Sequence, residues 1–464
     1  MKGAFLNAYV PEGELILVQP LKQLVDWGIV RSGILWKLRR AVYGLRQSPK
    51  WWSDERDSRL RTMKFTVGSQ GYYLQQNDAD SQLWMLTKES IDSTERRSMP
   101  STATGPPERR RGSPKTGENP DSRREVPSTA TGPPERRGEK PFDKEGPTEP
   151  DELLGLLCVY VDDFLAIAPK GPIRDGLIQA LISLWEFGPE RILSEETSLT
   201  FLGIDWIMRS NGDIFLTQER FTKELLTKHK MLDCNPLQCI TMNKPPEIDD
   251  IPSAELLTEL QSYAGAFNWL ATRTRPDLAY FTSLLASCAS KQGAWGKDLA
   301  KKVLRYLAGS ITQGLTMAAE GNEDDLIVFS HAGFAGADTK SQNGLVITWA
   351  GSILTWRSSR AALSALSTAE AELCAAALGW QVTEGIRYLL STLRIFPKKI
   401  EVMIDNKAAL TAATLGATWR TWYYAVRAKR LLEEHQMGRV QFSYCPTKEM
   451  VADALTKLAT ANVI

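Results

Sequence analysis

The sequence contains few of the residues that build metal clusters or disulfide frameworks. Its 464 residues include only 3 histidines and 6 cysteines, and no two cysteines form a CxxC pair. Structural zinc sites need Cys and His ligands at short, fixed spacings, so zinc modules and disulfide-stapled scaffolds are excluded. This cysteine usage favours a reduced, intracellular compartment, cytoplasmic and/or nuclear.

The sequence also lacks a long apolar run and an excess of either charge. Its longest apolar stretch, residues 153–168, is interrupted by Asp162 and Asp163, and Pro11 and Glu12 stand where a signal peptide would need apolar residues. We therefore expect no membrane span, no export signal and no membrane partner. The net charge is +1, so any attraction to nucleic acid must come from local groups of basic residues.

Composition divides the chain into four parts. Residues 88–150 are rich in Pro, Arg and Ser and poor in aliphatics, and the segment PSTATGPPERR occurs twice, at 100–110 and 127–137. Such a stretch buries too little apolar surface to fold, so we predict a disordered insert. The folded parts are then residues 1–87, residues 151–320 and, after a break rich in Gly, Asn and Asp, residues 326–464.

Local patterns predict several elements. Ser48 followed by Pro49 is typical of a helix start, and that helix should run to about Met63. The stretch from Glu14 to Val18 and the apolar runs at 326–329, 345–349, 353–356 and 440–444 read as strands, with a further strand ending at Asp405. With a helix from about Thr368 and a last helix near the C-terminus, the pattern indicates an α/β (α+β) fold.

Two adjacent carboxylates, Asp162 and Asp163, follow Tyr160-Val161 between two apolar runs, as at the tip of a β-hairpin. Aspartate is common in tight turns, so a plain β-turn explains the pair. Two carboxylates at such a tip also suit a pair of divalent cations that activate a hydroxyl and stabilise a leaving group. The four residues alone leave both interpretations open.

Seven ordered blocks resemble the reverse transcriptases of copia-type LTR retrotransposon Pol polyproteins. The residues from Tyr160 to Asp163 are similar to the metal-binding motif of the polymerase palm. The other blocks are residues 2–8, 36–52, 201–204, 216–218, 274–280 and 303–307, similar in order to DVKxAFLNG, LxKALYGLKQAPRxW, FLGI, LSQ, TRPDIAY and LRYLKGT. The resemblance implies a right-hand polymerase palm and a thumb-connection.

In this family Asp162 and Asp163 are catalytic metal ligands, and Tyr43, Arg46, Gln47 and Tyr160 line the nucleotide pocket. An amphipathic core helix with a charged face is the alternative for the block that contains Tyr43. The family's first metal-binding aspartate lies two residues ahead of the position of Lys2. From this we expect an N-terminally truncated palm without fingers and with impaired DNA synthesis.

Residues 326–464 resemble the ribonuclease H of the same elements. The blocks around Glu372, Asp405 and Asp453 are similar to SSTEAEY, DN and VPTxxxxADxLTK, which makes these three acids the expected catalytic metal ligands. Glu370 is an alternative to Glu372. The resemblance implies two Mg²⁺ ions per active site. His331 stands where the family has its leading aspartate, and imidazole is a poor Mg²⁺ ligand, so we expect impaired cleavage.

Aromatic and basic residues alternate from Trp419 to Arg430. Such a stretch can stack on bases and pair with phosphates. A solvated helix with a packed aromatic face accounts for it equally well.

Together these observations predict the C-terminal part of a copia-type Pol polyprotein. Its function would be RNA-dependent DNA synthesis and cleavage of RNA in hybrids, with an RNA template, a DNA primer, RNA–DNA hybrid and dNTPs as partners. An inactive nucleic-acid-binding remnant, or a translated transposon fossil, is the main alternative. An unrelated Mg²⁺ phosphotransferase would require the ordered block matches to be coincidental.

Overall fold

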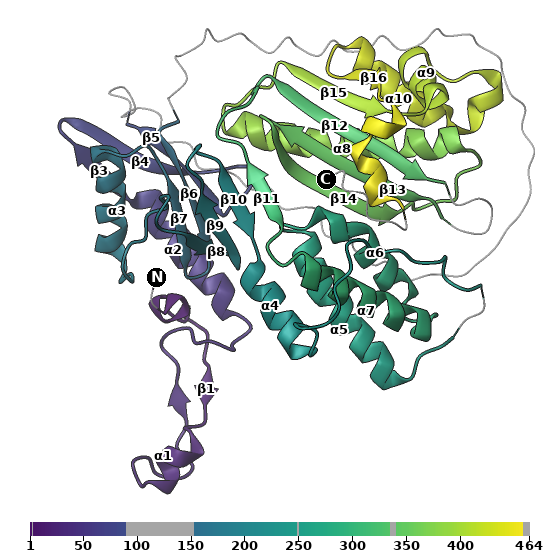
Figure 1. Ribbon diagram of the computed structural model, residues 1–464. Coiled ribbons are helices and arrows are strands. Elements are labelled where there is room, and N and C mark those ends of the chain that lie inside the picture. Colours follow the sequence, from purple (N-terminus) through teal and green to yellow (C-terminus); the bar gives the residue numbers. More distant parts are fainter. Residues whose placement is uncertain (2, 90–152, 248–249, 335–339, 458–464) are drawn as a thin grey trace, which may run out of the picture.

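The computed structural model describes residues 1, 3–89, 153–247, 250–334 and 340–457 (Figure 1). The predicted disordered insert lies almost entirely outside the described residues. The described chain forms three β-sheets of four or five strands, a short two-stranded ribbon, and the helices that cover them.

The first sheet is an antiparallel meander with strand order β3-β4-β5-β6-β7. Its strands are β3 (Lys64–Val67), β4 (Gln70–Gln76), β5 (Leu83–Lys88), β6 (Gly155–Tyr160) and β7 (Asp163–Ile167). Strands β5 and β6 lie on opposite sides of the long insert yet pair directly, with Leu83 opposite Cys158. Residues 1–87 and the start of the following part therefore share one core, which includes Trp52, Trp84 and Leu157.

Helices α2 (Ser48–Thr62) and α3 (Pro172–Leu184) pack against this sheet. The helix predicted from Ser48 is confirmed, but Ser48 is its first residue and not its cap. The Ser48 hydroxyl instead donates to the Val42 carbonyl at 2.7 Å and accepts from the Val42 amide at 3.2 Å, which closes the turn before the helix. The strand expected from Glu14 is shorter than predicted, because only β1 (Leu17–Val18) pairs, with β2 (Trp36–Lys37).

This ribbon and α1 (Lys22–Asp26) extend away from the rest of the molecule (Figure 1). The segment before them forms a 3₁₀ turn, η1 (Ala4–Asn7), against α2. Few residues of this N-terminal arm, which consists of β1, α1 and β2, are buried, because it has no second layer of helices or strands to pack against.

The middle of the chain combines a small antiparallel sheet with a helical layer. The sheet has the order β11-β10-β9-β8, formed by β8 (Leu199–Phe201), β9 (Ile204–Met208), β10 (Ile214–Thr217) and β11 (Gly314–Met317). The helical layer comprises α4 (Glu219–Lys228), α5 (Ala254–Ala271), η2 (Pro276–Leu278), α6 (Ala279–Cys288) and α7 (Gly293–Gly309). The resemblance block at 303–307 lies in the second half of α7, whose apolar face is buried in the helical core.

The third sheet is mixed, with the order β14-β13-β12-β15-β16. Its strands are β12 (Asp325–Gly333), β13 (Gln342–Trp349), β14 (Ser352–Arg360), β15 (Lys399–Ile404) and β16 (Gln441–Tyr444). The first three are antiparallel, whereas β15 pairs in parallel with both β12 and β16. Helices α8 (Thr368–Thr392), α9 (Lys407–Leu415) and α10 (Ala425–Gln436) pack with it, and η3 (Trp419–Tyr424) leads into α10.

The expected strands and helix of this last part are confirmed, except for the final helix. Near the C-terminus the described chain forms two 3₁₀ turns, η4 (Thr447–Glu449) and η5 (Val451–Leu455). The η5 turn packs closely on β13 because Gly344 has no Cβ. A Cβ at this position would lie 2.5 Å from the Ala452 carbonyl oxygen. Among the described residues, no helix is both long and apolar enough to cross a membrane.

Candidate active sites

The first candidate site is the β6–β7 hairpin, whose two-residue turn consists of Val161 and Asp162. Val161 has a φ of +49°, a left-handed conformation that is strained for a β-branched residue. The Trp52 indole donates a hydrogen bond to the Val161 carbonyl at 3.0 Å and holds the turn in this shape. Asp162 is half-buried and Asp163 is exposed at the start of β7.

The surroundings of Asp162 include one residue predicted to bind nucleotide. The Tyr43 hydroxyl donates to one carboxylate oxygen of Asp162 at 2.8 Å. Burial, together with this hydrogen bond and the charge of Asp162, raises the pKa of Tyr43. The Met1 amino group donates to the Asp162 carbonyl at 2.6 Å, so Met1 lies against the hairpin.

The other predicted nucleotide-binding residues lie on the surface near this hairpin or at the start of α2. Tyr160 is exposed at the end of β6, and Arg46 and Gln47 are exposed just before α2. Gly44, with a φ of +89°, provides the expected turn ahead of them. The structure thus brings Tyr43 to the aspartates and leaves Arg46, Gln47 and Tyr160 facing solvent.

The carboxylate of Asp162 is a suitable metal ligand. Among the described residues, its second oxygen is buried without a hydrogen-bond partner. A buried, unpartnered carboxylate oxygen is costly unless a cation or donor joins it. The Asp162 carboxylate could therefore hold a hard divalent cation, which is bound by oxygen ligands, and the exposed Asp163 follows it in the sequence.

The second candidate site lies at one end of the third sheet, where residues from four elements meet. Ser330 of β12 pairs with Ile404 of β15, so the next residue on each strand, His331 and Asp405, lies at the same edge. Glu372 enters from the second turn of α8, and Asp453 comes from η5. Sequence separations of 33 to 122 residues are bridged here only by the sheet and its helix.

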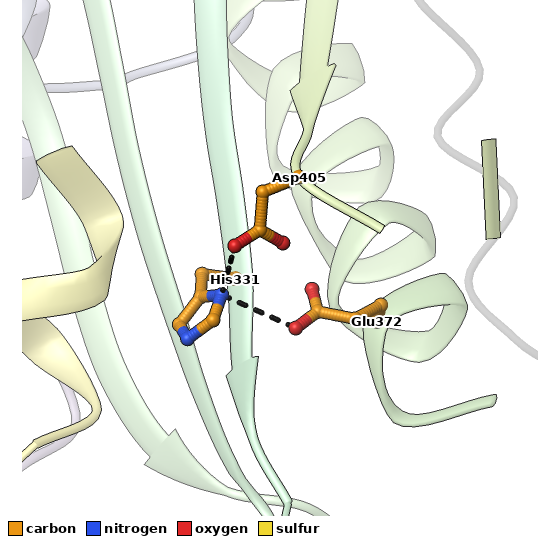
Figure 2. Close-up of side chains that lie close together, drawn as sticks. All are labelled: His331, Glu372 and Asp405. Atoms are coloured by element: carbon orange, nitrogen blue, oxygen red, sulfur yellow. Dashed lines mark ion pairs between the residues drawn. The ribbon is translucent and has the colours of Figure 1, made fainter. Parts of the chain in front are cut away.

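The His331 ring lies in the middle of three carboxylates. Its Nδ1 atom is 3.1 Å from Glu372 Oε1 and 3.3 Å from Asp405 Oδ2, as Figure 2 shows. Its Nε2 atom is 3.1 Å from Asp453 Oδ1, which also lies 2.7 Å from Lys457 Nζ. Four predicted site residues, His331, Glu372, Asp405 and Asp453, therefore form one cluster.

These contacts control the protonation of the cluster. Burial disfavours a charged ring, but the contacts with Asp405 and Glu372 outweigh it and raise the pKa of His331 to about 10. Burial raises the pKa of Glu372. Burial acts in the same direction on Asp405, but His331 and the Thr447 hydroxyl hold the pKa of Asp405 below its usual value. The ring is therefore cationic at neutral pH.

This charge state does not fit a pair of Mg²⁺ ions. A nitrogen of His331 and oxygens of Glu372 and Asp405 lie within 4.8 Å of one another, close enough to share one ion around a neutral ring. A protonated imidazole has no free lone pair, however, and Mg²⁺ prefers oxygen. The ring already makes the charge contacts that a cation would make with these acids.

The structure also shows that Glu370 and Glu372 have different surroundings. One oxygen of Glu370 accepts from the Leu366 amide at 2.6 Å, while Ser367 accepts from the Glu370 amide at 3.1 Å. Glu370 therefore belongs to the capping of α8, and Glu372, two residues on, faces the cluster.

Sequence reasoning missed three residues that support these sites. Trp52 holds the hairpin turn, the Thr447 hydroxyl donates to Asp405 at 3.2 Å, and Lys457 pairs with Asp453. All three lie inside blocks that carry the family resemblance, and this was the available signal. The partners of Trp52 and Thr447, however, lie far away in the sequence, whereas Lys457 pairs with Asp453 in the same block.

Comparison with curated proteins places the chain among transposon sequences. It is 24% identical over 324 residues to the retrovirus-related Pol polyprotein from transposon TNT 1-94 of Nicotiana tabacum, and 26% identical over 314 residues to that from transposon RE2 of Arabidopsis thaliana. The matches cover 66% and 65% of this chain. The chain is similar to a segment of transposon Pol polyproteins.

The matched segment spans 23% and 20% of the length of these two polyproteins. An uncharacterised mitochondrial protein of Arabidopsis thaliana is 27% identical over 230 residues, which is 48% of this chain and 90% of that protein. No protein-family model matches the chain.

Solved ribonuclease H structures are similar to 28% of this chain. One is the N-terminal RNase H domain of a Mycobacterium tuberculosis protein fused to maltose-binding protein, at 13% identity, 90% coverage of that chain and a TM-score of 0.22. Another is LC11-RNase H1 in complex with an RNA/DNA hybrid, at 16% identity, 92% coverage and a TM-score of 0.23.

Proposed function

We propose that the chain is a reverse transcriptase and ribonuclease H segment of a copia-type retrotransposon, in which hybrid binding is retained and RNA cleavage is strongly impaired. In this proposal residues 1–87 and the hairpin part of 151–320 form a palm, the rest of 151–320 a thumb-connection, and residues 326–464 an RNase H-like domain.

The observation that carries the proposal is the cluster of His331, Glu372, Asp405 and Asp453. Acids from three separate elements converge there although nothing in their local sequence requires it, and like charges at such distances are unfavourable without a cation. Their convergence supports an inherited catalytic centre. His331 in the fourth position supports the loss of cleavage.

The acids around His331 and the acids of the β6–β7 hairpin differ in their ability to bind a metal ion. Glu372, Asp405 and Asp453 surround a protonated imidazole, so this cluster does not support metal-dependent cleavage of RNA. At the hairpin, Asp162 and Asp163 are the residues that would hold Mg²⁺, which when bound activates a primer hydroxyl and stabilises departing pyrophosphate. Tyr43 orients the Asp162 carboxylate through its hydroxyl.

Partners follow from the same proposal. One of the similar solved structures, LC11-RNase H1, is in complex with an RNA/DNA hybrid, and we propose a hybrid as the ligand of the third-sheet domain. An RNA template, a DNA primer and dNTPs would serve the hairpin site. Arg46, Gln47 and Tyr160 are exposed, as residues that contact an incoming nucleotide must be.

The test is a cleavage assay on the full chain with an end-labelled RNA–DNA hybrid in Mg²⁺. We expect the wild type to bind the hybrid and leave it intact, and His331→Asp to cleave it, because the fourth carboxylate completes the oxygen ligand set. The matched control, His331→Asp combined with Asp405→Asn, should lose the gained activity. Efficient cleavage by the wild type would overturn the impairment.

A second assay addresses the hairpin. Extension of a DNA primer on RNA should depend on Mg²⁺ and disappear in Asp162→Asn, with Asp78→Asn as a control outside the site. A chain that binds no hybrid, extends no primer and gains no cleavage from His331→Asp would support the alternative, a transposon fossil without function.

A further inference from the structure

Two indole rings project from the surface where η3 leads into α10. Trp419 is 78% exposed and Trp422 is 73% exposed. The adjacent tyrosines behave differently, since Tyr424 is buried in the core and Tyr423 donates a hydrogen bond to the Ser367 hydroxyl at 3.1 Å. Of the two interpretations of this stretch, the packed aromatic face therefore applies to the tyrosines and fails for the tryptophans.

The sequence on both sides of these indoles is basic. From residue 407 to residue 432 the sequence contains five Lys and Arg residues and no Asp or Glu. Arg427, Lys429 and Arg430 are exposed on α10, and Lys407 Nζ lies 5.3 Å from the centre of the Tyr444 ring. Of the three exposed cations of α10, Lys429 and Arg430 pair with the two glutamates of the next turn, at 3.9 Å and 2.5 Å, whereas no ion pair is described for Arg427.

We propose that Trp419 and Trp422 form a stacking platform for the unpaired bases of single-stranded nucleic acid, with Arg427 contacting its phosphates. Indoles stack on any base, and neighbouring cations follow the backbone, so this combination recognises single strands with little regard to sequence. A purely apolar partner would gain nothing from the cations, and a duplex hides the base faces that the indoles would stack against.

The platform has a fixed relation to the cluster at His331. The Tyr423 hydrogen bond ties η3 to Ser367, which is the N-cap of α8, and α8 carries Glu372. This inference rests on the proposed nucleic-acid function and deepens it, because it names a single-stranded extension of the hybrid as the ligand of this surface.

Fluorescence anisotropy of the full chain with labelled oligo(dT) and with a blunt RNA–DNA hybrid tests the platform. The double variant Trp419→Ala/Trp422→Ala should bind oligo(dT) at least about tenfold more weakly, since loss of one base–aromatic stack costs about 1–3 kcal/mol. Its affinity for the blunt hybrid should stay within about twofold of the wild type. Trp419→Phe/Trp422→Phe should retain most of the single-strand affinity, because phenylalanine still stacks.

The matched control is Trp27→Ala, which removes an equally exposed indole, 70% exposed, from the N-terminal arm and should leave oligo(dT) binding unchanged. Arg427→Ala should lower the slope of log affinity against log salt by about one. The tryptophan variants should leave that slope unaltered.

Three outcomes overturn the platform. The first is unchanged oligo(dT) affinity in the double alanine variant, and the second is an equal loss of oligo(dT) affinity in Trp27→Ala. The third is a sedimentation result in which the wild type is a dimer and the double alanine variant is a monomer. The last would make this face an interface between copies of the chain. If the wild type binds neither oligonucleotide, the proposed function fails as well, whereas retained hybrid binding isolates the failure to the platform.

Discussion

Replacing His331 by glutamine should destabilise the third-sheet domain by several kcal/mol. The substitution removes the cation that lies 3.1 Å from Glu372 and 3.3 Å from Asp405. At an effective dielectric constant of about 20, each such contact corresponds to roughly 5 kcal/mol of Coulomb energy, which desolvation of the ring partly offsets. Breaking a buried ion pair by removing one partner costs about 3–5 kcal/mol, and we expect a loss in this range.

The loss should be smaller at acidic pH. Burial already raises the pKa of Glu372, and without the ring its carboxyl group can take up a proton instead of remaining charged beside Asp405. A neutral Glu372 removes most of the repulsion that the substitution exposes. The variant should therefore regain stability relative to the wild type as the pH falls.

Amide hydrogen exchange of the full chain is the appropriate assay, because several domains unfold separately and a single melting temperature would mix them. We expect faster exchange in β12, β15 and the first half of α8. The control is His435→Gln, which changes a histidine of the same domain whose Nδ1 atom lies 3.1 Å from the Val440 carbonyl oxygen. If His331→Gln loosens these strands no more than His435→Gln does, the ring is not the cation of the cluster.

Three further predictions concern pH, a buried ion pair and a glycine. His331 has a folded pKa of about 10 against an ordinary value of 6.5, so its stabilising contribution should be complete below 6.5, as long as its acid partners remain charged, and be lost as the pH rises through 10. The protection of the β12 amides, which is the intrinsic exchange rate at each pH divided by the measured rate, should fall from pH 6.5 to pH 10 in the wild type and stay flat in His331→Gln. Asp277→Asn should cost about 3–5 kcal/mol in the urea-unfolding transition of the helical layer, because Arg275 is buried and pairs with Asp277 at 2.7 Å; a cost below about 1 kcal/mol would contradict this. Gly344→Ala should displace η5 and accelerate exchange there, since its Cβ would lie 2.5 Å from an η5 carbonyl, whereas Gly265→Ala, with open space at its Cβ, should change nothing or slightly stabilise α5. Unaltered η5 protection in Gly344→Ala would refute the close packing.

Local patterns were sufficient for most elements of the fold. Ser48-Pro49 placed α2, and alternating apolar residues placed the strands of the third sheet, because backbone conformation follows from side chains a few positions away. The same patterns failed where the expected strand has no neighbouring strand to pair with. The strand expected from Glu14 needs a partner along its whole length, and only Leu17 and Val18 have one.

The candidate sites divide in the same way. The sequence determined which chemical groups exist, including Asp162 and Asp163 at a hairpin tip and a histidine in place of an aspartate. It could not decide between Glu370 and Glu372, since both precede the same apolar run. That choice depends on which face of α8 packs on β12, and this is a property of the assembled sheet.

Two features were decided by tertiary structure alone. His331 acquires its charge from two carboxylates, Glu372 and Asp405, that are distant in sequence, because a pKa responds to what lies within a few ångströms in space. Trp419, Trp422 and the buried Tyr424 are all aromatic residues of one short stretch, and only the packing of η3 shows which of their rings face solvent. The sequence by itself determined the kinds of residue and the local elements of this chain. The long-range pairing of strands decided which of those residues meet.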